Sequence, residues 1–115
     1  MQRKFRLTRS DDFKRVRQSG KSYAHPLIVL VTRAVEPPAL RVGVTAGRTV
    51  GNAVQRNRAK RLLREAMRPI LNRLPPGWNL VLIARPGLVG ATLDETRLAL
   101  FSLLRRAGLF PSNEA

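Results

Sequence analysis

The sequence contains no cysteine and only one histidine, His25. Without cysteine the chain has no disulfide, no thiolate metal site and no cysteine nucleophile. A single histidine cannot form a three-histidine zinc site. The longest apolar runs, residues 27–31 and 80–84, are far shorter than the roughly 18 residues that predict a membrane span. The basic N-terminus is followed by no apolar segment of the kind found in secretory signals. We therefore expect a soluble, cytoplasmic protein with no membrane partner.

Acidic residues are scarce as well. The chain has 7 Asp and Glu against 22 Lys and Arg, which gives a formal net charge of +15, and 18 of the 22 cations are arginine. The planar guanidinium group is always charged and binds phosphate through two parallel hydrogen bonds. The cations concentrate in residues 1–21 and 41–73. This composition predicts a polyanionic partner such as RNA.

The length of 115 residues and the 43% hydrophobic content predict a single domain over residues 1–115 with its own core. Helix signals begin near Ser10 and end at Gly20, and a capping-box pattern at Thr92 begins a last helix that ends near Gly108. A third helix follows Asn52, a favourable N-cap residue. Apolar runs at 27–32, 40–45 and 80–84 indicate strands, and we expect two or three strands before the middle helix and one after it. This order predicts an α+β fold, a two-layer sandwich of a small sheet with three helices.

Residues 51–65, GNAVQRNRAKRLLRE, predict an amphipathic helix. At 100° per residue its apolar stripe consists of Ala59, Leu62, Leu63, Ala66, Met67 and Ile70. The opposite side carries Asn57, Lys60, Arg61, Arg64 and Arg68. Arg61 and Glu65 form the only clear internal pair.

Cations at the start of this helix oppose the helix dipole by about 0.3–1 kcal/mol each. They are Arg56, Arg58, Lys60 and Arg61. Selection for stability alone would favour Glu at such positions, so we interpret the row as a surface for a polyphosphate. The alternative is an ordinary solvated basic face.

Catalytic motifs are absent. Gly43, Gly47 and Gly51 do not have the spacing of a P-loop or of a dinucleotide-binding fingerprint, and favour a tight strand-to-helix connection. The adjacent acids at 11–12 and 94–95 point apart on a helix, and they suit helix N-termini. His25 has no visible partner, and we interpret it as structural. We expect no catalytic residue and no metal ligand in the chain.

The chain resembles the protein subunit of bacterial ribonuclease P. The resemblance lies in four segments: "LTRSDDFKRV" at 7–16, "RVGVTAGRTVGNAV" at 41–54, "GNAVQRNRAKRLLRE" at 51–65 and "LVLIARP" at 80–86. It covers nearly the whole chain before Gly108. It implies a mixed sheet of the ribosomal-protein-S5-domain-2-like type with a left-handed crossover, against the usual right-handed rule.

The resemblance also implies a function. In this family the RNA subunit holds the catalytic Mg2+ ions and cleaves precursor tRNA to leave the mature 5′ end, and the protein alone is inactive. The partners implied are ribonuclease P RNA and precursor tRNA, with no obligate protein partner. The residues implied to bind RNA are Arg48, Asn52, Arg56, Asn57, Arg58, Lys60, Arg61, Arg64 and Arg68. The groove for the single-stranded 5′ leader is implied to involve Phe13, Arg17, Val31, Lys60 and Arg64.

Two positions depart from the family pattern. Arg17 and Val31 stand where family members often have aromatic residues, so the leader groove is expected to depend more on charge than on stacking. Phe13 itself suits either core packing or base stacking. The basic pair before the glycine is reduced to Arg48 and Thr49. The main alternative function is a structural RNA-binding protein such as a ribosomal component, and a protein-only nuclease has little support.

Overall fold

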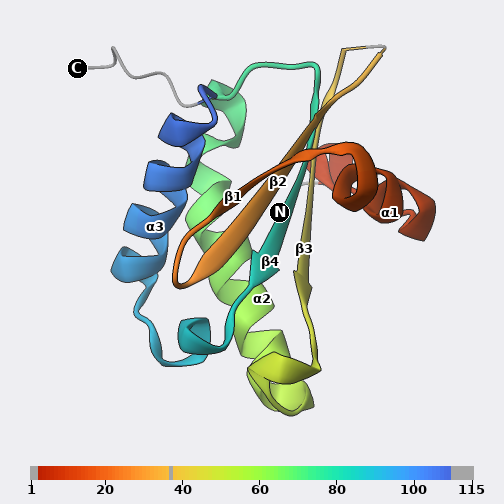
Figure 1. Cartoon of the computed structure of the whole chain (residues 1–115). Helices are drawn as coiled ribbons and strands as arrows, with labels where there is room; N and C mark the ends of the chain where they lie inside the picture. Colours follow the sequence, from red (N-terminus) through yellow and green to blue (C-terminus); the bar gives the residue numbers. More distant parts are fainter. Residues whose placement is uncertain (1–2, 37, 110–115) are drawn as a thin grey trace.

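The computed structural model describes residues 3–36 and 38–109, which form a four-stranded sheet and three α-helices (Figure 1). The strands are β1 (Lys21–Ala24), β2 (Ile28–Ala34), β3 (Leu40–Ala46) and β4 (Trp78–Ala84). The helices are α1 (Ser10–Ser19), α2 (Ala53–Met67) and α3 (Leu93–Arg106). Short 3₁₀ turns, η1 to η4, lie at Arg3–Phe5, Arg48–Val50, Arg68–Arg73 and Pro86–Gly90.

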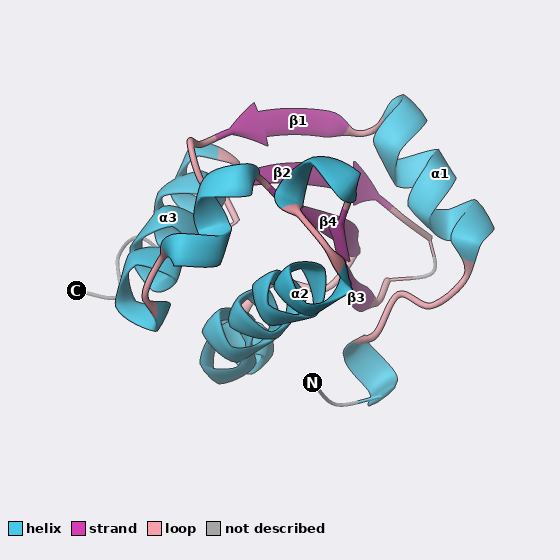
Figure 2. Ribbon diagram, turned by 90° about the horizontal axis from the view of Figure 1, so that it is seen from below, coloured by secondary structure: helices cyan, strands magenta, loops and turns pink. Residues whose placement is uncertain are grey.

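The sheet has the strand order β1-β2-β4-β3 and is mixed. β2 is antiparallel to both β1 and β4, whereas β3 and β4 are parallel neighbours. A parallel pair needs a crossover connection, and α2 provides it. Seen in the two views, the path from β3 through α2 to β4 turns in the left-handed sense (Figures 1 and 2). The mixed sheet and its unusual crossover agree with the α+β prediction.

The helices divide between the two faces of the sheet (Figure 2). α2 and α3 pack against each other and against one face, and together with the sheet they enclose the larger hydrophobic cluster. This pair of layers is the sandwich expected from the sequence. α1 lies on the opposite face, across β2 and β4, where Val16 closes a smaller cluster with Leu7, Val31 and Val81. Helices therefore cover both faces of the sheet, two of them on one face and one on the other.

Local sequence explains where the helices begin. α2 and α3 both start with a capping box: the side chain of Asn52 accepts from the backbone of Gln55, that of Thr92 accepts from Glu95, and both bonds are reciprocated. α1 has no side-chain cap, but Asp11 and Asp12 lie in its first turn. It ends at Gly20, where a Cβ would collide with backbone oxygens of the helix and of β2. Glycine thus permits α1 to approach the sheet.

Several elements differ from the prediction. β1 has no apolar run; it forms by pairing with β2, and its Tyr23 packs against the larger hydrophobic cluster. The middle helix ends at Met67 because Pro69 enters the next turn, so the buried Ile70 lies in η3 and not in α2. β2 and β4 each extend two residues beyond their apolar runs, to Ala34 and back to Trp78.

Candidate RNA-binding surface

α2 is anchored by its apolar side. Ala59, Leu63, Ala66 and Met67 are completely buried, and Leu62 is half-buried against the same cluster. These side chains pack against β3, β4 and α3. The apolar stripe predicted for this helix is confirmed for every member that lies within it. The remaining sides of the helix are left to polar and charged residues.

The polar residues of α2 point in three directions. Arg56, Lys60 and Arg64 are spaced one turn apart and form a half-buried flank. Asn57, Arg61 and Arg68 are exposed on the outer side. Arg58 lies on the other flank, where its Nε donates a 3.0 Å hydrogen bond to the carbonyl oxygen of Val89. We call these residues the α2 surface; its members are Arg56, Asn57, Arg58, Lys60, Arg61, Arg64 and Arg68.

Almost none of this positive charge is neutralised within the protein. Glu65 is the only acid of α2, and it pairs with Arg68 at 2.8 Å instead of the predicted Arg61. At i,i+3 spacing Arg68 reaches the carboxylate equally well, and the bond leaves Arg61 exposed. In the part of the chain that the structure describes, the other cations of the α2 surface form no ion pair. They are available to an external anion.

The backbone at the start of α2 is arranged so that an anion could approach it closely. Gly51 has φ +144°, a conformation that other residues rarely adopt, and a Cβ there would meet the Gln55 side chain. The turn leads to Asn52, whose side chain caps the helix. No acid lies in the first turn of the helix. The exposed Arg48 lies one turn earlier in η2. Backbone amides and cations thus meet at the positive end of the helix dipole.

A shallow hollow marks the outer side of the same turns. It has a volume of about 360 Å³ and is lined by Val54, Asn57, Arg58 and Arg61. Val54 is 77% exposed, the most exposed of the large hydrophobic side chains described. A bare apolar side chain between guanidinium groups suits contact with a sugar or a base beside the phosphates.

The face that carries α1 presents the other predicted residues. Phe13 is half-buried and packs against the smaller hydrophobic cluster, and its ring lies directly over Gly43, where a Cβ would collide with it. Arg17, one turn later, is exposed. Val31 is only 2% exposed and lies beneath α1, so its side chain is covered and does not reach a ligand. Phe13 therefore packs on the sheet and keeps part of its ring exposed.

The structure does not bring all predicted groove residues to one face. Phe13 and Arg17 belong to α1, whereas Lys60 and Arg64 belong to α2 on the other side of the sheet (Figure 2). β3 is the edge strand between them. A single strand of RNA would contact both sets only by passing this edge. Near its start the edge is occupied by the N-terminal segment, since Leu7 donates to the carbonyl oxygen of Val42.

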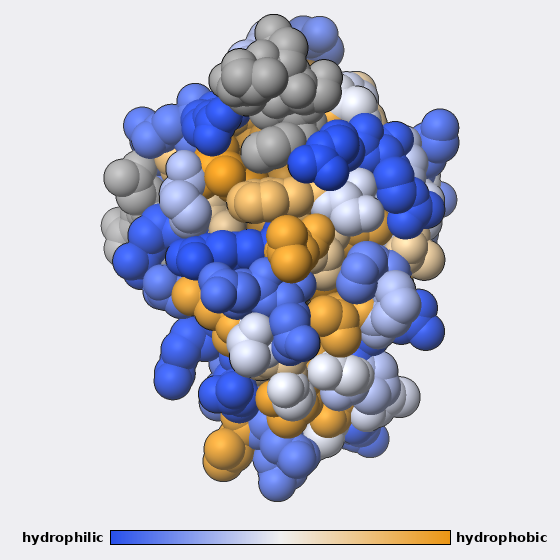
Figure 3. Space-filling view, turned by 90° about the vertical axis from the view of Figure 1, so that its left-hand side faces the viewer, coloured by the Kyte–Doolittle hydropathy of each residue, from blue (hydrophilic) through white to orange (hydrophobic). Residues whose placement is uncertain are grey.

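On the side that carries α3, hydrophobic and hydrophilic side chains are interspersed (Figure 3). Hydrophobic side chains reach the surface there, among them Leu98, which is 69% exposed and lines a hollow with His25, Leu27 and Glu95. Nδ1 of His25 accepts a hydrogen bond from the backbone of Leu27, which confirms its structural role in the turn between β1 and β2. Within residues 3–36 and 38–109, no helix is long and apolar enough to cross a membrane.

Comparisons with known proteins agree on one family. A sequence model of the family Ribonuclease P matches residues 1–108. The chain is 38% identical over 114 residues to the ribonuclease P protein component of Herpetosiphon aurantiacus, covering 99% of this chain and 93% of that protein. It is 40% identical over 113 residues to that of Chloroflexus aurantiacus, covering 97% and 84%. The fold matches the RNase P protein of Staphylococcus aureus with a TM-score of 0.82 at 28% identity, covering 92% of this chain and 97% of the other.

Proposed function

The chain belongs to the ribonuclease P protein family and is the protein component of that endoribonuclease ribonucleoprotein, and from this premise we propose how its surfaces are used. The α2 surface docks on the ribonuclease P RNA. The groove beside α1 holds the single-stranded 5′ leader of precursor tRNA. The protein promotes removal of the leader by positioning the substrate, while the RNA subunit carries out the hydrolysis.

The observation that supports docking through α2 is its uncompensated charge. The helix begins with no acid in its first turn, and the one acid further along is paired with Arg68. Cations at a helix N-terminus and like charges one turn apart both destabilise an isolated protein. Phosphates placed there reverse the sign of both effects and release bound counterions. An RNA partner thus explains a charge pattern that is unfavourable for folding alone.

Leader binding is supported by the two partly or fully exposed side chains of α1, Phe13 and Arg17. The exposed part of Phe13 offers a face for one base, and Arg17 offers a guanidinium one helical turn away. Val31 is buried under α1, so no second ring or side chain from β2 contributes at that position. The groove therefore holds the leader mainly by charge. Arg64 is assigned to the same leader where it passes the edge of β3.

The reaction chemistry in this proposal belongs to the RNA. The catalytic Mg2+ ions are held by the RNA subunit, and residues 3–36 and 38–109 bring together no group of three or more His, Asp or Glu side chains that could hold a metal ion. The protein screens the repulsion between two RNAs, since both are polyanions, and fixes the scissile phosphate in place. The proposal includes a cytoplasmic location for the complex.

The test compares the binding of leader-bearing precursor tRNA with the binding of leaderless tRNA. Arg64→Ala should weaken binding of leader-bearing precursor tRNA to the RNA–protein complex by about tenfold, and binding of leaderless tRNA much less. Arg105→Ala is the matched control, because Arg105 also lies in the last turn of a helix and is exposed, on α3. Equal losses for both tRNAs with Arg64→Ala would contradict the leader role. RNA binding without any gain in cleavage would favour a structural RNA-binding protein.

A further inference from the structure

A second group of arginines lies on the face that carries α1, away from the α2 surface. Arg6, Arg9 and Arg41 line a hollow of about 530 Å³ at the start of α1, and Arg15, Arg33 and Arg41 line a neighbouring hollow of about 240 Å³. Asp12 borders both hollows, which makes them one continuous surface. We call this surface the arginine patch; its members are Arg6, Arg9, Arg15, Arg33 and Arg41.

Sheet register places the centre of the patch. Arg33 on β2 and Arg41 on β3 both pair with Asn79 on β4, so the three side chains form one row on one face of the sheet. Neighbouring strands are about 4.8 Å apart, so the two arginines emerge roughly 10 Å from each other. They are eight residues apart in the chain, and only the β2-β4-β3 order brings them together.

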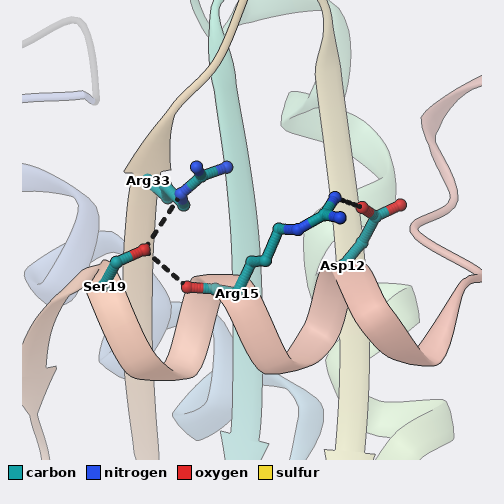
Figure 4. Close-up of polar contacts among 4 residues, drawn as sticks. All are labelled: Asp12, Arg15, Ser19 and Arg33. Carbon is teal, nitrogen blue, oxygen red and sulfur yellow. Dashed lines mark hydrogen bonds and ion pairs between the residues drawn. The ribbon is translucent and has the colours of Figure 1, made fainter.

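The guanidinium groups are held by neutral acceptors. Nε of Arg33 donates to Oγ of Ser19 at 3.0 Å, and Ser19 in turn donates to the carbonyl oxygen of Arg15 at 2.7 Å. The rest of the Arg33 guanidinium extends away from Ser19 (Figure 4). Nη1 of Arg41 donates to the carbonyl oxygen of Lys4 at 2.7 Å. These bonds orient the side chains and leave their charge intact.

The negative charge nearby does not cancel the positive charge. Two acids, Asp12 and Glu36, line the hollows beside five arginines. Asp12 pairs with Arg15 at 3.3 Å (Figure 4). In the described part of the chain, the other four arginines of the patch form no ion pair. Oriented guanidinium groups with free donors are the usual means of binding phosphate.

From this arrangement we infer that the arginine patch binds backbone phosphates of RNA, at a place separate from the α2 surface. The inference rests on the proposed function, which supplies the RNA. The patch lies where β3 begins, whereas α2 follows the end of β3 and covers the other face. The sheet therefore lies between the arginine patch and α2.

The test removes two charges and keeps the anchoring bonds. In the double variant Arg33→Gln and Arg41→Gln, the side-chain amides still donate hydrogen bonds, so the bonds to Ser19 and Lys4 have a substitute. The matched control is Arg105→Gln with Arg106→Gln on α3, which also removes one exposed arginine and one anchored to a backbone carbonyl, that of Ala24. Thermal unfolding of both variants checks that each is folded.

Affinity is measured against salt concentration for two RNAs. The first is ribonuclease P RNA alone, and its binding to the protein is measured. The second is precursor tRNA with a short or a long leader, and its binding to the RNA–protein complex is measured. The patch variant should bind one of them about tenfold more weakly. The slope of log affinity against log salt should fall by about 0.7 to 0.9 for each phosphate that the variant no longer binds. If the variant binds ribonuclease P RNA more weakly, the patch contacts the enzyme's own RNA. If it weakens only the binding of precursor tRNA with the long leader, the patch contacts the substrate.

The inference is wrong if the patch variant and the α3 control have the same affinities and salt slopes with both RNAs. Arg61→Gln on the α2 surface is measured in parallel. If this variant weakens RNA binding and the patch variant does not, only the arginine patch is excluded. If neither variant changes RNA binding, docking through α2 fails as well.

Discussion

α2 and α3 are alike in structure and differ in where their charges lie along the helix. Both begin with a capping box, both pack on the same face of the sheet, and they contact each other. The first turn of α3 carries Asp94 and Glu95, and its last turn carries Arg105 and Arg106. This arrangement matches the helix dipole at both ends. α2 has Gln55 at the capping-box position, no acid in its first turn, and cations along its length.

The comparison separates what folding requires from what binding requires. Apolar packing and capping are satisfied equally in the two helices, so the fold accounts for those features. The charge pattern of α3 stabilises the helix, whereas that of α2 does not. The difference is therefore assigned to an external polyanion on α2, and four paired substitutions test this assignment.

The largest expected effect is on folding, and it should be the same for both helices. Leu63 on α2 and Leu103 on α3 are completely buried. Leu63→Ala and Leu103→Ala should each lower the free energy of unfolding by about 2–5 kcal/mol, because each leaves a cavity in the same core. Urea denaturation measures both values. A negligible change for Leu63→Ala would mean that α2 is not anchored as described.

Charge reversal should affect the two helices differently. Arg61 and Arg105 are both exposed. Arg61→Glu should weaken binding to ribonuclease P RNA by about a hundredfold, because attraction to phosphate becomes repulsion. Arg105→Glu should change the affinity only slightly. Filter binding at one fixed salt concentration gives both dissociation constants, and similar losses would show that only the overall net charge matters.

Removing the caps tests whether the start of α2 has a second role. Asn52→Ala and Thr92→Ala each remove a side-chain oxygen that accepts from the third residue of its helix. Each should lower the free energy of unfolding by about 1 kcal/mol. Asn52→Ala alone should also weaken RNA binding, because it loosens the turn that presents the cations of α2. If both variants bind RNA like the unchanged protein, Asn52 is only a cap.

The smallest expected effects come from changing the charge at the capping-box residue of each helix, and they test the comparison of α2 with α3 most directly. Gln55→Glu keeps the acceptor for the Asn52 amide and adds a negative charge at the start of α2. It should raise the free energy of unfolding by about 0.3–1 kcal/mol and weaken RNA binding. Glu95→Gln on α3 should lower the free energy of unfolding by a similar amount and leave RNA binding unchanged. Thermal unfolding and RNA titration of both variants give the four values, and a stabilised Gln55→Glu protein with undiminished affinity would refute the assignment.

Much of the fold could be predicted from the sequence, because helices and strands here follow simple periodic patterns. The apolar stripe of α2, the cap at Asn52 and the capping box at Thr92 are all predicted by local sequence and are present. β1 is not predicted, because residues 21–24 have no apolar pattern of their own and form a strand only by pairing with β2. The family and the left-handed crossover follow from resemblance and not from periodicity.

Less of the candidate site than of the fold could be predicted from the sequence. Helical spacing alone allows Arg61 or Arg68 to pair with Glu65, and the structure selects Arg68. Arg33 and Arg41 are not singled out by the sequence, because they lie on separate strands and become neighbours only through the sheet order. The division of the groove residues between two faces also depends on the crossover. Such long-range relations carry no local sequence signal.

The central claim is that this chain supports cleavage by a bacterial ribonuclease P RNA through the α2 surface. The most direct measurement is cleavage of a precursor tRNA by that RNA at limiting Mg2+, without protein, with this protein and with its Arg61→Glu variant. The account predicts correct 5′ maturation with the unchanged protein, little without protein, and a large loss with the variant. Equal cleavage in all three reactions would contradict it.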